Sequence, residues 1–353
     1  MSGESAMTSV NASVRTPRVS GEELLRVQHL VKRFPVNHRI GSRRRELVAV
    51  DDVSFSVSRG ETLGIVGESG CGKSTLARCV MGLERPSGGA IAIEGRDLTT
   101  ASKKTMRSLR RDVQMVFQDP YDSLNPRRRV GDIVAEPMLV HGLADAAGAR
   151  KEAARLFDVV GLNPRYLDRY PNEFSGGQRQ RVGIARALAA KPKILVADEP
   201  VSALDVSVQA QVLNLLSALQ REFDLTYIFV SHNIDVVRYM SDRIAVMYLG
   251  RIVEMASAAD IYAAPQHPYT VSLLGAIPNN LVGNGAAAGK RRRRIVLRGD
   301  IPSPVDRPSA CPFEPRCPVA QEICRVRDPE FRTLDDGRYI ACHFPGSLDP
   351  FEA

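Results

Sequence analysis

Short apolar runs alternate with glycine-rich or polar stretches along most of this chain. Near the N-terminus, "ELLRVQHLVKRFPV" and "LVAVDDVSFSV" alternate apolar and polar positions, which predicts antiparallel strands. A short apolar run precedes the glycine-rich "GESGCGKST", and similar runs recur in "KILVADEP", "TYIFVSHN" and "RIAVMYLGRIVE". Because helix-like segments such as "VLNLLSALQREF" separate these runs, we expect an α/β fold with a parallel core sheet, a small antiparallel β subdomain and a helical insert.

Changes in composition divide the chain into three predicted parts. Residues 1–20 are small and polar, which predicts a disordered leader. Residues 21–264 form the predicted nucleotide-binding domain, with the helical insert at about 120–172. Residues 265–353 are rich in proline and hold four of the six cysteines, so we expect a separate C-terminal extension. Within it, "NNLVGNGAAAGKRRRR" is typical of a linker or long loop.

Composition and charge narrow the class of protein. The 353 residues are 44% hydrophobic and 25% charged, with a net charge of +8. No apolar run approaches the roughly 20 residues that span a bilayer, which predicts a soluble, cytoplasmic protein. The excess positive charge gathers in "HRIGSRRR" and "GKRRRR". We interpret these runs as solvated loops, with membrane headgroups and nucleic acid as the alternatives.

The segment "GESGCGKST" fits the pattern of a phosphate-binding loop between a strand and a helix. Glycines there let backbone N–H groups cradle phosphates, a lysine reaches the β and γ oxygens, and a serine hydroxyl binds Mg²⁺. We expect Cys71 and Cys79 to be small packing side chains rather than nucleophiles. The predicted phosphate-binding residues of this loop are Gly67, Ser69, Gly70, Cys71, Gly72, Lys73, Ser74 and Thr75.

Two further segments suit the chemistry of a nucleotide. In "ILVADEP", a buried strand brings Asp198 to its end, where a carboxylate can hold Mg²⁺, and Glu199 follows as a general base for water. In "FSGGQRQR", a serine and two glycines precede a helix, and such a helix N-terminus binds anions. The predicted residues of this second anion loop are Ser175, Gly176, Gly177 and Gln178.

Taken in order, these motifs resemble those of the nucleotide-binding subunits of ABC transporters. "SGGQ" is similar to the signature loop of that family, "SALD" to its dimer-contact loop, "VSHN" to its switch histidine and "VFQDP" to its glutamine loop. The resemblance implies that two cassettes clamp head to tail around ATP, so that the signature loop binds the nucleotide of the partner cassette.

The same resemblance assigns individual roles. It makes Glu199 the catalytic base, His232 the sensor of the γ-phosphate, and Gln118 the link between Mg²⁺, water and the membrane subunits. Ser74, Gln118 and Asp198 would bind the Mg²⁺. Phe34 would stack on adenine, although an aromatic residue at the end of a first strand is also often part of the core.

Two longer segments narrow the resemblance. "FQDPYDSLNPR" and "HPYTVSLLGAIP", followed by the cysteines, are similar to the second ATPase subunit of oligopeptide and dipeptide importers and their nickel-transporting relatives. This implies a sister ATPase, two membrane-spanning permease subunits and an extracytoplasmic substrate-binding protein, at the cytoplasmic face of the inner membrane. The alternative is a soluble ABC ATPase that acts on nucleic acid or ribosomes. The chain has neither long heptads nor a second cassette, so we expect no nucleic acid.

The cysteines of the tail are candidate metal ligands: Cys311, Cys317, Cys324 and Cys342. Their spacing is wider than that of paired zinc ligands and matches no ferredoxin pattern. Four thiolates are the usual ligands of an iron–sulfur cluster, and the resemblance to peptide importers implies a [4Fe–4S] cluster. Zinc remains an alternative, as do four buried cysteines with no metal.

Overall fold

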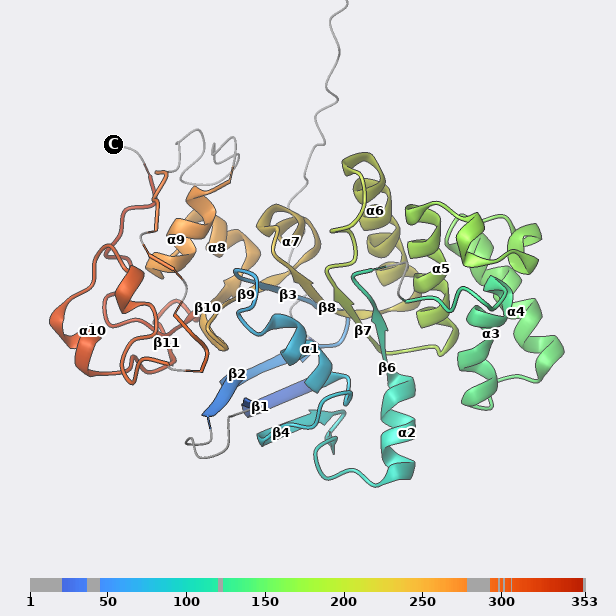
Figure 1. Cartoon of the computed structure of the whole chain (residues 1–353), viewed down its shortest axis with the longest axis horizontal. Helices are drawn as coiled ribbons and strands as arrows, with labels where there is room; N and C mark the ends of the chain where they lie inside the picture. The colour runs from blue at the N-terminus through green and yellow to red at the C-terminus, as the bar shows by residue number, and fades with distance from the viewer. Residues whose placement is uncertain are drawn as a thin grey trace, which may run out of the picture.

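The computed structural model describes residues 21–36, 45–119, 123–277, 293–297, 299–300, 302–305 and 307–351. The predicted leader at 1–20, most of both basic runs and most of the predicted linker lie outside these residues. Two sheets and the helices around them make up the described chain, with the helical insert at one end and the C-terminal extension at the other (Figure 1).

The smaller sheet is antiparallel, as the alternating pattern predicts. Its strand order is β2-β1-β4-β5, and the strands are β1 (Glu23–Val36), β2 (Arg45–Ser58), β4 (Gly88–Ile93) and β5 (Arg96–Asp97). Apolar residues of one face, such as Leu25, Val53 and Ile91, are almost fully buried. Phe34 pairs with Leu47 across β1 and β2, and both residues line the pocket described below.

The larger sheet has the order β11-β12-β10-β9-β3-β8-β7-β6. Its parallel strands are the predicted apolar runs: β3 (Thr62–Val66), β6 (Val113–Val116), β7 (Ile194–Asp198), β8 (Thr226–Ser231) and β9 (Arg243–Tyr248). Helices flank this sheet (Figure 1). The carboxyl ends of parallel strands meet at one edge, which is where ligands bind in open α/β sheets.

The helices follow the sequence pattern closely. Those that flank the sheets are α1 (Lys73–Val80), α2 (Lys103–Asp112), α5 (Gly176–Ala189), α6 (Val206–Phe223), α7 (Ile234–Met240), α8 (Ala258–Ala263) and α9 (Pro268–Gly275). The helical insert consists of α3 (Val130–Val140), α4 (Ala146–Val159), η1 (Pro164–Asp168) and η2 (Pro171–Glu173). Its apolar side chains, among them Phe157, pack into the same core as α5.

The C-terminal extension is not the separate piece that its composition suggested. It contains η3 (Glu314–Arg316), α10 (Glu322–Val326), β11 (Arg332–Thr333) and β12 (Tyr339–Ile340), and β12 pairs with β10 (Arg251–Ser257) in the larger sheet. Phe313 is buried in the main core. The predicted boundary at 264–265 lies between α8 and α9. Strands of two residues are too short to leave a periodic pattern, which is why the sequence did not reveal this attachment.

Candidate nucleotide-binding site

The phosphate loop runs from the end of β3 to the start of α1, as predicted. A Cβ atom at Gly67 would come within 2.1 Å of the carbonyl oxygen of Met247, and one at Gly72 within 2.1 Å of that of Ala49. Gly72 also has φ 105°, a conformation that side chains rarely allow. Both glycines are therefore required by the close approach of neighbouring backbone, and the loop keeps its narrow shape because of them.

Lys73 begins α1 and its side chain folds back over the loop. The Nζ group donates to the carbonyl oxygens of Gly67 at 2.8 Å and Glu68 at 3.0 Å. Cys71, in the loop, and Cys79, on α1, are buried in the core. Burial raises the pKa of both thiols, that of Cys79 to about 11. Both cysteines are thus held as neutral thiols, which suits packing rather than nucleophilic chemistry.

Ser74 and Asp198 meet where β7 ends beside α1. The Ser74 hydroxyl donates to Oδ1 of Asp198 at 3.1 Å. The Asp198 side chain is buried, and burial raises the pKa of its carboxyl. A hydroxyl and a carboxylate are oxygen ligands of the kind that Mg²⁺ binds, and a cation there would favour the ionised carboxylate.

Two predicted residues, Gln118 and His232, meet at one carboxylate oxygen of a third, Glu199, and each of the three follows a different strand. Oε2 of Glu199 accepts a hydrogen bond from Nε2 of Gln118 at 3.0 Å and lies 3.1 Å from Nδ1 of His232. Glu199 itself has a left-handed backbone, with φ 46°, and its N–H donates to the carbonyl of Val230 at 2.8 Å. Strained backbone of this kind is held by the surrounding sheet and is often found at functional sites.

These groups line a pocket of about 570 Å³. The predicted residues that line it are Phe34, Ser69, Gly70, Gly72, Lys73, Ser74, Thr75, Gln118, Glu199 and His232. Gly67, Cys71 and Asp198 are not among the residues that line it. Residues that sequence reasoning missed also line the pocket, namely Leu47, Val48, Ala49, Leu249, Gly250 and Pro304. The first three belong to β2, where Leu47 pairs with Phe34.

Pro304 reaches the pocket from the C-terminal extension. Its carbonyl accepts a hydrogen bond from the Val48 N–H at 3.1 Å, next to the strand that carries Phe34. No local pattern in the sequence marks Pro304, because the chain separates it from β2 by some 250 residues. The extension therefore borders the nucleotide pocket directly.

The signature loop lies elsewhere. Ser175 is the N-cap of α5, with its hydroxyl accepting from the Gln178 N–H at 3.4 Å and its own N–H donating to Oε1 of Gln178 at 3.0 Å. A Cβ atom at Gly177 would come within 2.4 Å of Cγ1 of Val208. Ser175 is exposed. None of the four predicted residues of this loop lines the pocket of the same chain, so this helix N-terminus is open to another molecule.

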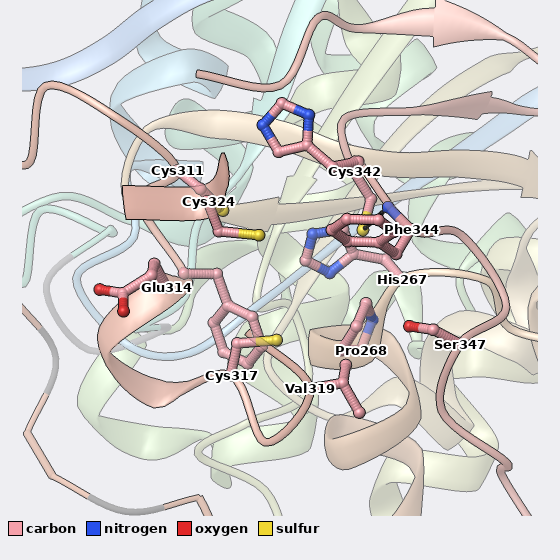
Figure 2. A pocket seen from close by; sticks show the side chains of 12 residues that line it. His267, Pro268, Cys311, Glu314, Cys317, Val319, Cys324, Cys342, Phe344 and Ser347 are labelled. Carbon is pink, nitrogen blue, oxygen red and sulfur yellow. Dashed lines mark hydrogen bonds between the residues drawn. The ribbon is translucent and has the colours of Figure 1, made fainter. Parts of the chain in front are cut away.

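The four cysteines of the extension come together. They line a small cavity of about 10 Å³ with His267, Phe313 and Phe344, and Figure 2 shows their sulfurs gathered around one space. All four are free. Burial raises the pKa of the Cys317 thiol to about 11 and that of Cys311 to about 12. Among the described residues, no group of three or more histidine, cysteine or acidic side chains is placed to hold a metal ion.

Comparison with known families agrees with this geometry. A family model described as "ABC transporter" matches residues 50–202, and one described as "Oligopeptide/dipeptide transporter, C-terminal region" matches residues 253–324. The oligopeptide transport ATP-binding protein AppF of Bacillus subtilis is 47% identical over 324 residues, covering 91% of this chain and 97% of the relative. The chain belongs to the ATP-binding subunits of ABC transporters.

A second relative of this ABC subunit, the di/tripeptide transport ATP-binding protein DppF of Pseudomonas aeruginosa, is 47% identical over 322 residues. These residues cover 91% of this chain and 98% of that relative. The predicted family is thereby confirmed, and the chain is an ATPase coupled to transport. Its function in a transporter is favoured over the alternative of an ATPase that acts on nucleic acid or ribosomes.

Solved structures place the fold in the same family. The ATP-binding cassette MJ0796, in a dimeric structure bound to ADP and Pi, has a TM-score of 0.59 and is 29% identical, covering 67% of this chain and 99% of its own. The cbiO1 protein of Clostridium perfringens has a TM-score of 0.58 and is 30% identical, covering 69% of this chain and 92% of its own. Within the described residues, no helix of the ABC subunit could span a bilayer.

Proposed function

We propose that this ABC subunit hydrolyses ATP to power the import of peptides. The observation that carries the proposal is the match of its C-terminal region to the oligopeptide and dipeptide transporter model, together with relatives named for peptide transport that align over almost their full length. The ATP-binding cassette by itself does not indicate which substrate is transported. Only the extension separates peptide transport from the other tasks of this family.

ATP would bind in the pocket that the phosphate loop borders. The loop N–H groups and Lys73 would hold the phosphates, and the half-buried Phe34 ring would stack on adenine at the edge of β1. Ser74, Asp198 and Gln118 are the residues that would hold Mg²⁺, whose charge neutralises the phosphate oxygens when it is bound. The oxygen-rich donor set fits this cation.

Glu199 would act as the general base for the attacking water. Its carboxylate lies at the surface of the pocket, fixed between Gln118 and His232. Gln118 would orient water and His232 would contact the γ-phosphate as it develops charge. A base that is already positioned by two neighbours loses little entropy on reaction, which supports this assignment.

The signature loop would bind the ATP of a second cassette. Ser175, Gly176 and Gly177 do not line the pocket of their own chain, and they lie at the start of a helix of 14 residues. A head-to-tail dimer would therefore place each signature helix on the phosphates held by the other subunit. We assign the second cassette to a non-identical sister ATPase.

Permease subunits would dock near the glutamine loop and the helical insert. Phe117, beside Gln118, is 40% exposed, and Leu139 and Val140 on α3 are 46% and 52% exposed. Large apolar side chains that are exposed suit a partner surface. Two membrane-spanning subunits docked there would keep this subunit at the cytoplasmic face of the inner membrane, with a substrate-binding protein outside the membrane. Closure of the cassettes on ATP would then move the permease.

We further propose that Cys311, Cys317, Cys324 and Cys342 hold a [4Fe–4S] cluster. Four free thiols border one cavity, and each comes from a different part of the extension. Four thiolates are the usual ligands of such a cluster, which would cross-link the extension and take no redox step in ATP hydrolysis.

Uptake by intact cells tests the peptide assignment. Replacement of the chromosomal copy by Glu199→Gln should abolish uptake of labelled di- and oligopeptides while the transporter still assembles. Uptake of nickel, measured in the same cells, should be unchanged. Loss of nickel uptake with normal peptide uptake would instead assign the subunit to a nickel transporter.

A further inference from the structure

The phosphate loop carries one acidic residue, Glu68, that the ATP site does not use. Glu68 does not line the pocket, and its carboxylate forms a two-point ion pair with Arg316 of the extension, with Nη1–Oε2 at 2.7 Å and Nη2–Oε1 at 3.2 Å. The Arg316 side chain is only 8% exposed and that of Glu68 27%. Pairs of this fork geometry are the strongest that arginine makes, so this contact fixes the direction of the Glu68 side chain.

The backbone of Glu68 is held at the same time. Its N–H donates to the hydroxyl of Tyr269 at 2.9 Å, and its carbonyl accepts from Nζ of Lys73 at 3.0 Å. Tyr269 lies on α9 and is fully buried. The residue that carries one of the two carbonyl partners of the phosphate-binding lysine is therefore anchored twice by the C-terminal part of the chain.

The two residues that hold Glu68, Tyr269 and Arg316, belong to or adjoin a packed aromatic cluster. The rings of Tyr248 and Tyr269 have centroids 4.8 Å apart, and Phe313 packs edge-on against both, at 5.3 and 5.5 Å. Phe313 is 1% exposed, and its carbonyl accepts from the Arg316 N–H at 3.0 Å. Arg316 extends from this packed cluster, so its side chain has few alternative positions. It can therefore hold the Glu68 carboxylate in one place.

The charges of the Glu68–Arg316 ion pair matter for ATP binding. ATP brings several negative charges to the phosphate loop, and an unpaired carboxylate within the loop would repel them. The guanidinium of Arg316 neutralises Glu68, and the Glu68 carboxylate in turn raises the pKa of Arg316 above its ordinary value. The Arg316 guanidinium therefore stays positively charged beside the loop.

We propose that Arg316 is a positioning residue for ATP, which holds the phosphate loop in its binding conformation and neutralises the negative charge of that loop through Glu68. The C-terminal extension is then a working part of the ATP site. The proposal depends on ATP hydrolysis and not on which cargo is carried.

The test is ATP hydrolysis by the assembled transporter carrying Arg316→Ala. We expect the KM for ATP to rise about tenfold, as a loss of about 1.4 kcal/mol in binding would give, while kcat changes less than about twofold. Direct titration with a fluorescent ATP analogue should show the same loss of affinity. The matched control is Arg325→Ala, because Arg325 pairs with Glu314 at 3.0 Å but is 70% exposed, and its KM should not change.

A second substitution separates charge from packing. Adding Glu68→Gln to Arg316→Ala removes the unpaired carboxylate, so the double variant should regain most of the lost affinity. An unchanged KM in Arg316→Ala, or a double variant no better than the single one, would overturn the proposal. If Arg316→Ala does not assemble, Arg316→Gln carries the same test, since glutamine keeps a polar side chain in place without the charge.

Discussion

At the scale of single residues, the site depends on side chains brought to the ends of neighbouring strands. Gln118, Glu199 and His232 follow β6, β7 and β8, which are adjacent in the sheet. Each lies one or two positions beyond its strand, so their meeting at one carboxylate oxygen follows from strand order. The tight backbone at Glu199 gives that carboxylate a fixed direction.

Glu199→Gln and Lys73→Ala should fail in different ways. Losing a positioned base costs roughly 10² to 10⁴ in rate and leaves the phosphate contacts intact. Glu199→Gln should therefore bind ATP normally and trap the closed dimer, whereas Lys73→Ala should lose nucleotide affinity. Single-turnover hydrolysis and ATP titration separate the two, and normal turnover by Glu199→Gln would contradict its assignment as base.

Sequence reasoning found the residues whose neighbours in the chain form a motif. It missed Leu249, Gly250 and Pro304, which line the same pocket but arrive from segments with no motif of their own. It also gave no role to Glu68, although that residue lies inside the phosphate loop, because its partner Arg316 is 248 positions away. Contacts over such distances depend on the packing of the extension, which leaves no periodic signal.

At the scale of elements, the apolar runs predicted the parallel strands well, because strands buried on both faces leave continuous apolar sequence. The two-residue strands of the extension could not be predicted in this way. Helix α5 shows the strength of a local signal: Ser175 and Gln178 form the reciprocal capping contacts expected of this spacing, so the helix begins where the sequence indicates.

Ser175→Arg should damage the ATP site of the partner cassette and spare the site on this chain. The bulky, charged side chain would stand at the exposed N-terminus of α5, where the partner's phosphates are expected. Photolabelling with a nucleotide analogue after a round of hydrolysis reports each chain separately. Loss of hydrolysis in the nucleotide bound to this chain, with normal hydrolysis on the sister, would contradict the crossed arrangement.

At the scale of the whole molecule, the extension is joined to the cassette through buried polar contacts. The buried carboxylate of Glu254 on β10 accepts hydrogen bonds from the N–H groups of Gln266 at 2.8 Å and His267 at 3.0 Å. His267 in turn caps α9, with Nδ1 accepting from the Tyr269 N–H at 3.0 Å. Burial lowers the pKa of His267 to about 3. The histidine is therefore neutral in the folded protein.

This histidine should make folding sensitive to acid. Its pKa in the unfolded chain is about 6.5, so the unfolded state takes up a proton first as the pH falls. Stability is fully present above that pH and is lost between about 6.5 and 3, by up to about 1.4 kcal/mol per pH unit. Urea unfolding at pH 7 and pH 5.5 should show a smaller loss in His267→Asn. The control is His29→Asn, an exposed site, which should match the parent protein.

The cysteine cavity gives the last prediction, also at the scale of the whole molecule. A cluster bound by Cys311, Cys317, Cys324 and Cys342 would cross-link the segments around η3 and α10 with the chain after β12. Protein purified without oxygen should then be brown and contain about four iron atoms per chain. Cys317→Ser should lose the colour and lower the midpoint of thermal unfolding. ATP binding should persist, since Arg316 and Phe313 keep their own contacts with the cassette. Colourless protein with no iron would rule out the cluster, and one zinc per chain would assign the thiols to that metal instead.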